Sequence, residues 1–569
     1  MTKPSIAVFS GPTATVQNSE PLVTSNKARL KYGLPPLTAP DGSPVRFDAL
    51  RPQRLAASVT VYVEQFSAHP LEADAAELYG PPDGFLSAAG VFSSERTSAS
   101  DRPVYEVVLN PEDGLYWLPY MARQHDGSAW ESECAFPLAP ANQCRQTFFP
   151  DASRILEEID RIGLDENGKA SMLANKANFT FFRAAPSAGY KKGLPAASRT
   201  DAGTGGDTDD IAPETMNDDF WAYRPVHLRQ EPPRGTAATL ANVVKNALAT
   251  GEYQGAIWLE GSPSVDETTY WLNLLIDTTV PICGNSSQRP HGALSNDGDR
   301  NIVDSVDYIL SGIALDEAGR DTVGGVLIVD ELIFSARDVH KADARPGGYT
   351  MTGGHGGIVG SIGQPGPPVL TYRPARLHTF RSKVRISQLP DTVNGVYSGG
   401  GPVEVVPVRV KDASGDLLPS AIPSVTFLKT GRYQPDSSNI SAETEVDVLA
   451  RIEKNLRDCP LAGFVAEGSA PFGSLTNAIE AALMRGLCSG MPFVKVGRGN
   501  AEGMVPRNPP YLYISGLNMT ANKARLLLMA AMMKLGALPP AADPCNPTPE
   551  ELGAIKATLD QYQAIFDTH

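Results

Sequence analysis

The chain has no excess of positive charge and no long apolar run. Its 569 residues carry a formal net charge of −15, which sets 49 Lys and Arg against 64 Asp and Glu. A surface of that sign repels nucleic-acid phosphates and anionic membranes. The longest apolar stretch, near residues 526–533, is far shorter than the roughly 20 residues that a membrane-spanning helix needs. The sequence therefore predicts neither a nucleic-acid partner nor a membrane partner.

Cysteine and histidine are also scarce. The six cysteines are scattered without CxxC spacing, which argues against a disulfide-stapled or zinc-stabilised fold. Cys134 and Cys144 could pair, but free buried thiols are the favoured interpretation. The eight histidines show no HExxH or other paired spacing, so neither a catalytic metal nor any other cofactor is predicted. The first 13 residues lack the apolar core of a signal peptide, which indicates a cytoplasmic protein.

Several common catalytic signatures are missing as well. No nucleophile elbow, P-loop or GxGxxG fingerprint occurs at a strand-to-helix turn. The glycine-rich residues 353–363 lack the Lys-Ser/Thr of a phosphate-binding loop, and a mobile loop is the favoured interpretation. The chemistry must therefore be sought in other turns.

The chain does contain a regular alternation of strands and helices. A strand is expected at residues 5–9, and from residue 236 apolar segments of helical and strand spacing alternate, with continuous apolar strands. This pattern predicts an α/β protein with mainly parallel sheets covered by helices. A helix is expected to begin at Asp266 as its N-cap residue. The tail at 548–566 is expected to be an amphipathic surface or subunit brace.

Composition divides the chain into three parts. Residues 50–205 are β-rich and end in a Gly/Asp/Thr linker, which indicates an insert. Residues 1–49 and 206–395 then form an N-terminal lobe around it. Residues 396–569 form a C-terminal lobe with a helical tail. The predicted architecture is two α/β lobes and one β-rich insert.

Three side chains that follow predicted parallel strands can carry chemistry. Thr13 follows the first strand, Ser262 follows the strand that ends at Leu259, and Lys341 follows the strand that ends at Val329. Ligands bind beyond the carboxyl ends of such strands. A hydroxyl needs a neighbour that takes its proton, and a lysine whose pKa is lowered can do this. Helix capping by the two hydroxyls, and a surface ion pair of Lys341 with Asp338 or Asp343, are the structural alternatives.

Six ordered motifs over residues 1–25 and 205–569 resemble the L-asparaginase/glutaminase family. The first, second and fourth contain the three side chains above, and the last two lie further along the chain. They are Ser10-Gly-Pro-Thr13, Glu260-Gly-Ser-Pro-Ser-Val-Asp-Glu-Thr268, residues 286–298, Ser335-Ala-Arg-Asp-Val-His-Lys341, Pro374-Ala-Arg-Leu-His378 and Ser515-Gly-Leu-Asn…Asn522-Lys-Ala-Arg525. The resemblance implies two asparaginase-like lobes and amide hydrolysis with Thr13 as nucleophile. It also implies that Ser262 and Lys341 assist catalysis.

The sequence departs from that family where the substrate's amino-acid head group would bind. Pro263 stands where the family has an aspartate, and Pro213 stands where it has a serine, although the neighbouring Glu214 can still offer a polar contact. Proline carries no charge and no donor. The family's flexible-loop tyrosine has no clear equivalent, with Tyr32 as a candidate. The substrate-binding set is predicted as Glu214, Gly261, Pro263 and Asp266.

The predicted function is therefore hydrolysis of a small amide or lactam other than free asparagine, through a Thr13 acyl-enzyme. Asp266 or Glu260 would replace the lost carboxylate. Two alternatives stay open: an L-asparaginase/glutaminase with a rewired pocket, and a non-catalytic binding protein that keeps the fold. Because the family's sites are completed across subunits, a homodimer or homotetramer is also expected.

Overall fold

The structure is a computed structural model whose described residues cover both lobes and parts of the insert. They are residues 3–11, 23–25, 47–53, 59–63, 82–87, 92–109, 116–119, 176–183, 234–261, 264–288, 297–345, 347–351, 357–363, 366–430, 441–498, 505–507, 509 and 512–569.

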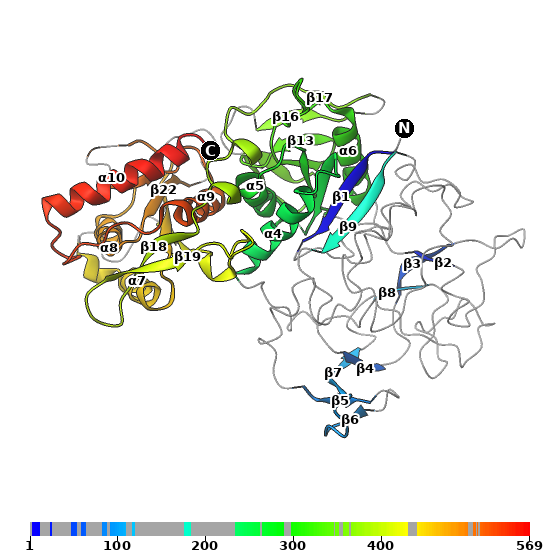
Figure 1. The fold of residues 1–569 in the computed structure, drawn as a ribbon, viewed down its shortest axis with the longest axis horizontal. Coiled ribbons are helices and arrows are strands. Elements are labelled where there is room, and N and C mark those ends of the chain that lie inside the picture. The colour runs from blue at the N-terminus through cyan, green and yellow to red at the C-terminus, as the bar shows by residue number, and fades with distance from the viewer. Residues whose placement is uncertain are drawn as a thin grey trace, which may run out of the picture.

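The N-terminal lobe is built on an eight-stranded sheet (Figure 1). Five parallel strands form most of it, and three antiparallel strands complete one edge. The parallel strands, in spatial order, are β9 (Asn178–Arg183), β1 (Ser5–Ser10), β10 (Gly255–Leu259), β11 (Ile282–Asn285) and β12 (Val326–Val329). The antiparallel strands are β13 (Leu332–Ser335), β16 (Ile358–Ser361) and β17 (Val369–Leu370). The predicted mainly parallel α/β class is confirmed.

Both faces of this sheet are covered by helices, as the continuous apolar strands require. Alternate residues of β1 and β10 enter different cores, because successive side chains of a strand point to opposite faces. Phe9 and Trp258 pack with helices α4 (Thr236–Leu248) and α5 (Val265–Leu275). Val8 and Ile257 pack with helix α6 (Gly298–Ser311) on the other face. The strand ends are thereby held rigidly between two cores.

The strand β9 lies far from the other sheet strands in sequence. It falls inside the predicted insert at 50–205, yet it pairs in parallel with β1 over six residues, from Ser5 opposite Asn178 to Ser10 opposite Arg183. Figure 1 shows the two strands side by side at the sheet edge. The N-terminal sheet therefore takes one strand from the end of this segment.

The other described strands before β10 are short, and they span the predicted boundary at residue 50, since β2 and the start of β3 precede it. Two small sheets have the orders β2-β3-β8 and β4-β7-β5-β6. Their strands are β2 (Val23–Ser25), β3 (Phe47–Gln53), β4 (Val59–Val63), β5 (Gly84–Leu86), β6 (Phe92–Ser93), β7 (Arg102–Leu109) and β8 (Tyr116–Pro119). The sequence also predicts a short helix at 152–162, a segment that lies outside the described residues. The division into lobes and insert remains a prediction.

The C-terminal lobe has a four-stranded parallel sheet flanked by helices. Its strands are β20 (Ser424–Lys429), β21 (Ala462–Gly468), β22 (Phe493–Gly497) and β23 (Ile514–Ser515), in that order. Its helices are α7 (Val446–Asp458), α8 (Asn477–Cys488), α9 (Ala521–Leu535) and α10 (Pro549–Phe566). A two-stranded antiparallel pair, β18 (Thr392–Tyr397) and β19 (Glu404–Arg409), stands in the connection between the lobes.

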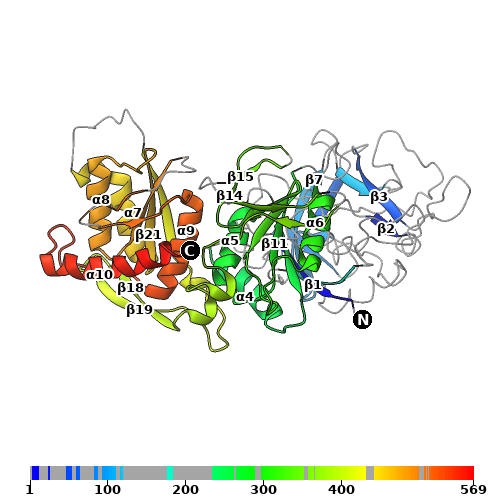
Figure 2. The same ribbon diagram turned by 90° about the horizontal axis from the view of Figure 1, so that it is seen from above.

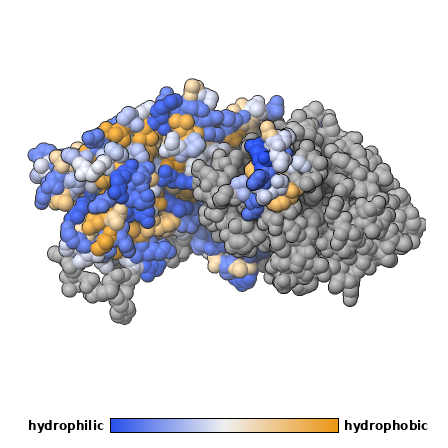
Figure 3. Space-filling model, turned by 90° about the horizontal axis from the view of Figure 1, so that it is seen from below, coloured by the Kyte–Doolittle hydropathy of each residue, from blue (hydrophilic) through white to orange (hydrophobic). Residues whose placement is uncertain are grey.

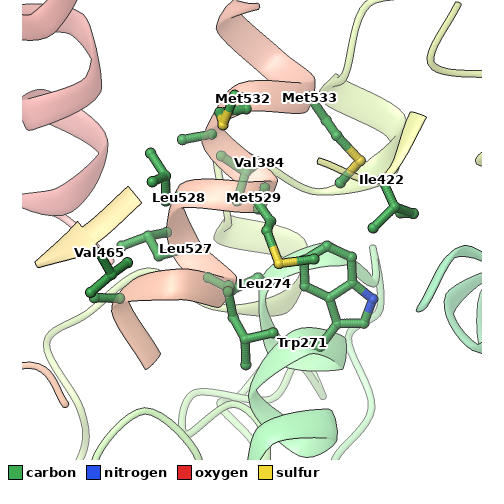
Figure 4. Close-up of a cluster of buried hydrophobic side chains, with 14 of the residues drawn as sticks. Trp271, Leu274, Val384, Ile422, Val465, Leu527, Leu528, Met529, Met532 and Met533 are labelled. Carbon is green, nitrogen blue, oxygen red and sulfur yellow. The ribbon is translucent and has the colours of Figure 1, made fainter. Parts of the chain in front are cut away.

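The two lobes share one apolar core, centred on α5 and α9. Figure 4 shows Met529 of α9 next to Trp271 of α5, in a buried cluster that also includes Leu274 of α5 and Leu527 of α9. Trp271 is buried, and its indole Nε1 donates a hydrogen bond to the Ala237 carbonyl at 2.9 Å. Burial of large side chains is the main favourable term in such packing. The lobes are therefore fixed relative to one another at α5, and α5 begins at the candidate site.

The tail helix α10 belongs to the core of the C-terminal lobe. It begins with a capping box between Thr548 and Glu551, and it packs on α9 and β23. Its residues Leu559, Tyr562 and Phe566 are buried. The apolar stripe of this amphipathic helix is therefore covered by its own lobe, and a role between subunits stays a prediction. The chain's C-terminal end lies where the two lobes meet (Figures 1 and 2).

Two local expectations also need correction. Helix α5 begins at Val265 after Ser264, so Asp266 lies inside its first turn and is not the N-cap residue. Lys341 does not lie in the loop directly after Val329. A tight turn with positive φ at Asp330 and Glu331 leads into β13, and Lys341 ends the later strand β14 (Val339–Lys341). Turn chemistry of this kind leaves little trace in hydrophobic periodicity.

Other expectations concern the surface and the cysteines. Among the described residues, no helix is both long enough and apolar enough to cross a bilayer, and no group of three His, Cys, Asp or Glu side chains could hold a metal ion. Cys283, Cys459, Cys488 and Cys545 are free thiols, and Cys134 and Cys144 lie outside the described residues. Figure 3 shows hydrophilic residues with apolar ones interspersed over the described part of one face.

Candidate functional site

The ends of β1 and β10 bring two of the predicted turns together. Ser10 is opposite Leu259 in the parallel pair, and the Gly11 amide donates to the Leu259 carbonyl at 2.8 Å. A Cβ atom on Gly11 would lie 2.8 Å from the Trp258 ring and 3.1 Å from the Glu260 Cβ, so a side chain does not fit there. Glycine at this position lets the backbone approach closely. The Ser10–Thr13 turn therefore starts against the Glu260 turn.

The Glu260 turn leads directly into α5. The Glu260 amide donates to the Asn285 carbonyl at 3.1 Å, which ties the turn to the end of β11. The carbonyl of Gly261 accepts hydrogen bonds from Ser264 and Val265 at 2.9 and 3.2 Å, which starts the helix. Amides at a helix N-terminus have no partner within the helix and carry partial positive charge. This end of α5 therefore favours negative charge.

Glu260 is buried at the base of the site, with 2% of its surface exposed. Its Oε2 accepts a hydrogen bond from Trp258 Nε1 at 2.8 Å, and its carboxyl also bonds Thr268 of α5. Burial raises the pKa of Glu260 to about 7 against these hydrogen bonds. Its side chain joins β10 to α5 and can exist in both protonation states near neutral pH.

Asp266 is the second buried carboxyl at this helix end, with 4% exposed. Its Oδ2 lies 3.8 Å from Nζ of Lys523, which reaches across from α9 in the C-terminal lobe. Burial raises the pKa of Asp266 to about 6, and the charge of Lys523 opposes that rise. Burial likewise lowers the pKa of Lys523, which is fully buried. The two groups form a buried ion pair between the lobes.

Lys341 lies on β14, a strand that contacts α5. It is directly opposite Tyr349 in the pair of β14 and β15 (Tyr349–Met351), and its Nζ lies 4.4 Å from the centre of the Tyr349 ring. Burial lowers the pKa of Lys341, and the charges of Asp297, Asp343 and Asp266 oppose this. The amine is therefore only partly desolvated and lies within electrostatic reach of Asp266.

The alternative explanation of Lys341 as a surface ion pair is not supported. Arg337 bonds the Asp338 carboxylate at 2.6 Å, and Arg345 bonds the Asp343 carboxylate at 2.6 Å. No ion pair of Lys341 with either aspartate occurs among the described contacts within 4.0 Å. Its Nζ instead lies over the ring of Tyr349, as expected for a cation near a ring face, and donates a 3.4 Å hydrogen bond to the Arg345 carbonyl.

Ser286 and Asp297 complete the described part of the site. Ser286 follows β11 and shares a 3.0 Å hydrogen bond with the hydroxyl of Tyr349, and both side chains are buried. Asp297 precedes α6 and accepts a hydrogen bond from the Gln288 amide at 3.0 Å. The start of the loop after β11 thus contacts Tyr349, which is paired with Lys341. The far end of the same loop holds Asp297, whose charge opposes the lowering of the Lys341 pKa.

Arg337 links the Lys341 segment to the C-terminal lobe. Its buried guanidinium donates to the Asn518 side chain at 3.0 Å and to the backbone oxygen of His569 at 2.9 Å. Leu517, beside Asn518, has a φ of 54°, which is uncommon for a bulky residue. Two motifs that are far apart in sequence, 335–341 and 515–525, are therefore one interlobe contact.

Gly261 and Asp266 lie at the start of α5, and the strand that ends at Lys341 contacts this helix. Thr13, Ser262, Pro263 and Glu214 lie outside the described residues, as do Pro213 and Tyr32. The predicted roles of these residues in catalysis and binding therefore stay predictions. Only the backbone segments that lead into the Thr13 and Ser262 turns are described.

Sequence reasoning missed Lys523 and Tyr349 as parts of this site. Lys523 did stand in a recognised motif, Asn522-Lys-Ala-Arg525, but spacing alone does not show that it crosses to the other lobe. Tyr349 lies in none of the recognised motifs, and only its strand pairing with Lys341 shows that it belongs to the site. Glu260 was noted as a possible carboxylate, whereas its burial follows from the packing of Trp258 and α5.

The described groups suit proton transfer next to a polarised carbonyl. Two carboxyls have pKa values raised into the range of about 6 to 7, and a lysine has a lowered pKa. Such shifts are typical of groups that exchange protons during catalysis. The amides at the start of α5 can stabilise an oxyanion.

A family model described as "Asparaginase, N-terminal" matches residues 234–347. The chain is 25% identical over 298 residues to L-asparaginase 2 from Bacillus subtilis (strain 168), covering 52% of this chain and 65% of that protein. It is 32% identical over 103 residues to a glutaminase-asparaginase from Acinetobacter glutaminasificans, covering 18% of this chain and 29% of that protein. The chain thus spans less than two thirds of each of these relatives.

Among solved structures, the chain is similar to a probable cytoplasmic L-asparaginase from Campylobacter jejuni. The match has a TM-score of 0.44 and 17% identity, and it covers 69% of this chain and 92% of that one. The matched range 234–347 contains Glu260, Asp266 and Lys341, whereas Thr13 and Lys523 lie outside it.

Proposed function

We propose that this chain is an amidohydrolase of the asparaginase-like family and that it cleaves a C–N bond in a small amide or lactam. The observation that carries the proposal is the contact of β14, the strand of Lys341, with α5, whose first turn holds the buried carboxyl of Asp266. A partly desolvated amine beside a carboxylate can take up and return a proton.

In the proposed reaction, the Thr13 hydroxyl attacks the amide carbonyl and a new C–O bond forms. The hydroxyl proton passes through Ser262 and Lys341 to the leaving nitrogen as the C–N bond breaks. Backbone amides of the Ser10–Thr13 and Gly261–Ser262 turns stabilise the oxyanion. Water then hydrolyses the acyl-enzyme and restores the Thr13 hydroxyl.

Of the two carboxyls that could replace the family's aspartate at Pro263, we favour Asp266, because it lies in the first turn of the helix that contacts the Lys341 strand. Its charge acts on Lys341, which is the role that the replaced aspartate has in the resemblance. Glu260 is engaged by Trp258 and Thr268 and acts as a brace between β10 and α5. Asp266 would therefore orient the lysine.

We propose that the substrate lacks a free α-amino acid head group. A zwitterionic head group needs paired charges in its pocket. Pro263 and Pro213 stand where the resemblance places two of the groups that hold it. Loss of two charge-assisted hydrogen bonds, each contributing roughly 1.5–3 kcal/mol, weakens transition-state binding of asparagine on the order of 10²–10⁴-fold.

A second function follows from the names of the relatives. The Bacillus subtilis protein is named L-asparaginase 2, and the Acinetobacter protein is named a glutaminase-asparaginase. An L-asparaginase or glutaminase with a rewired pocket, in which Glu214 or a neighbouring subunit replaces the anchors, is therefore the competing proposal. A non-catalytic binding protein with this fold is the third.

The experiment that separates these functions measures ammonia release or ring opening from asparagine, glutamine, simple amides and lactams. We expect the highest kcat/KM for an amide or lactam without an α-amino group. If asparagine is the best substrate by a wide margin, the rewired asparaginase is correct. If no substrate is turned over and an electrophilic amide analogue does not label Thr13, the binding protein is correct.

Two variants sharpen this test. Thr13→Ala should abolish turnover while the far-ultraviolet circular dichroism stays unchanged, because Thr13 is proposed as the nucleophile. Pro263→Asp restores the family's carboxylate and should raise kcat/KM for asparagine relative to simple amides. Pro263→Asn is the matched control, since it removes the proline without adding charge. Equal effects of the two substitutions at position 263 would contradict the proposal that the missing carboxylate weakens asparagine binding.

The proposed partners are a small amide substrate and further copies of the chain. A homodimer or homotetramer follows from the family resemblance, in which a neighbouring subunit completes each site. Symmetric assemblies of identical chains are also the commonest oligomers.

A further inference from the structure

Lys523 occupies a position that ordinary helix energetics disfavours. It is the third residue of α9 after the cap Thr520, whose hydroxyl accepts a hydrogen bond from the Lys523 amide at 3.3 Å. A cation at a helix N-terminus is repelled by the helix dipole, and an acidic or amide side chain is the usual choice at this position. Lys523 is also fully buried, which adds a cost of desolvation. Both costs need a compensating partner.

The partner is the first turn of α5. The Lys523 ammonium donates to the Asp266 backbone carbonyl and lies 3.8 Å from the Asp266 carboxylate. The same ammonium lies 5.4 Å from the centre of the Tyr270 ring. A carboxylate, a carbonyl and an aromatic face thus surround it. Lys523 therefore binds the residue of the site that also acts on Lys341.

The neighbours of Lys523 hold it there. Glu267, next to Asp266, accepts a 2.7 Å hydrogen bond from Asn522 and a 2.8 Å bond from Arg525. Below these polar contacts, α5 and α9 share the apolar core shown in Figure 4. The start of α9 is thus fixed on the start of α5, and Lys523 is directed at Asp266.

We propose that Lys523 of the C-terminal lobe is a positioning residue for the site of the N-terminal lobe: it keeps Asp266 ionised beside Lys341. This inference rests on the amidohydrolase function proposed above. Without the ammonium, burial favours the neutral carboxyl, and Lys341 loses a negative neighbour that keeps its amine charged. The C-terminal lobe would then set the pH range in which the site works.

Several other charged and titratable groups face this pair. The test therefore has to show that a pH effect comes from Asp266 and not from one of these groups. They are Glu260 before α5, Glu267 and Tyr270 on α5, Arg337 and Asp338 after β13, His340 and Lys341 on β14, and Arg376. Burial lowers the pKa of His340, and the charge of Lys523 lowers it further.

The test is the pH profile of kcat/KM for Lys523→Met, measured with the best amide substrate. Removal of an adjacent opposite charge raises the pKa of a carboxyl by about 1–3 units, so the acid midpoint should move to higher pH by that amount. Lys523→Arg keeps the charge and should keep the midpoint near that of the wild type. Lys523→Met added to Asp266→Asn should cause no further change in the profile.

The matched control is Lys495→Met. Lys495 also pairs with a carboxylate, Glu480 at 2.7 Å, and also lies over a tyrosine ring, 4.6 Å from the centre of Tyr513, but within the C-terminal lobe. Its removal should leave the acid midpoint unchanged. An unchanged midpoint in Lys523→Met, or an equal shift in Lys495→Met, would overturn the proposal.

A second readout does not depend on turnover. The pH dependence of Lys341 acylation by a small anhydride, followed by mass spectrometry, reports the Lys341 pKa directly. Lys523→Met should lower its midpoint, since Asp266 becomes neutral, and an unchanged midpoint contradicts the inference even if no amide is hydrolysed. If Lys523→Met does not fold, Asp266→Asn should lower the Lys341 midpoint and Lys523→Arg should keep it; any other result refutes the inference.

Discussion

The buried carboxyl of Glu260 makes a quantitative prediction about stability. Glu260→Gln replaces it with a group of the same shape that carries no charge at any pH. The glutamine oxygen can still accept from Trp258 Nε1, and its amide can donate to the Thr268 hydroxyl. The substitution thus copies the protonated form of Glu260 and removes only its ionisation.

The expected size follows from the environment of this side chain. Burial raises the pKa of Glu260 from its ordinary value of 4.5 to about 7. A group whose pKa is raised on folding binds more protons in the folded state, so the wild type loses stability as pH rises from 4.5 through 7. At about 1.36 kcal/mol for each pH unit, the full loss is about 3 kcal/mol.

The assay is urea unfolding of the wild type and Glu260→Gln between about pH 5 and about pH 8, followed by fluorescence and circular dichroism. Near the acid end the two proteins should be almost equally stable. The advantage of the glutamine variant should grow with pH and level off above neutrality at about 3 kcal/mol. Glu404→Gln on the exposed strand β19 is the control, because that carboxylate is already solvated.

A difference between the two proteins that stays constant over this range would refute the reasoning. It would mean that the Glu260 carboxyl keeps its ordinary pKa, either because water reaches it or because its hydrogen bonds fully offset its burial. A wild type that becomes more stable with pH relative to the variant would reverse the sign, and would show that the ionised form is the one favoured in the folded state.

The other predictions concern catalysis, packing and assembly. Lys341→Met should lower kcat/KM by about 10²–10⁴-fold, as loss of a general acid–base does, and activity within about tenfold of the wild type would remove Lys341 from the mechanism. Trp271→Ala should lower the free energy of unfolding by about 3–5 kcal/mol in urea titrations, with a smaller loss in Trp271→Phe. Light scattering should show a dimer or tetramer, and a fully active particle of 60.6 kDa would contradict this.

The sequence alone determined the class of the fold and the order of its main elements. The runs at 5–9 and 255–259 are continuously apolar, which identifies strands covered on both faces, and the structure confirms both. The helical repeat that begins at residue 236 is also confirmed, although the helix ends at Leu248, before the predicted end at Gly251. Hydrophobic periodicity is sufficient to predict such elements, because the positions of the apolar residues along the sequence show whether one face or both faces of the element are buried.

Part of the candidate site was also readable from the sequence. Asp266 and Lys341 stood in motifs after strands, and parallel strands place their following turns at one edge of a sheet. The prediction that Asp266 caps α5 was wrong by two residues, because the start of a helix depends on local backbone geometry that a polar residue only favours. The placement of Thr13, Ser262, Pro263 and Glu214 stays a prediction.

Only the tertiary structure decided which distant groups share the site. Lys523 lies 257 residues from Asp266 in the chain, and no local pattern says that α9 presents it to α5. The pairing of β9 with β1 and of Tyr349 with Lys341 likewise depends on how separate segments dock. The raised pKa of Glu260 and the ion pair of Asp266 follow from the same docking, because desolvation is a property of what surrounds a group in space and not of its neighbours in sequence.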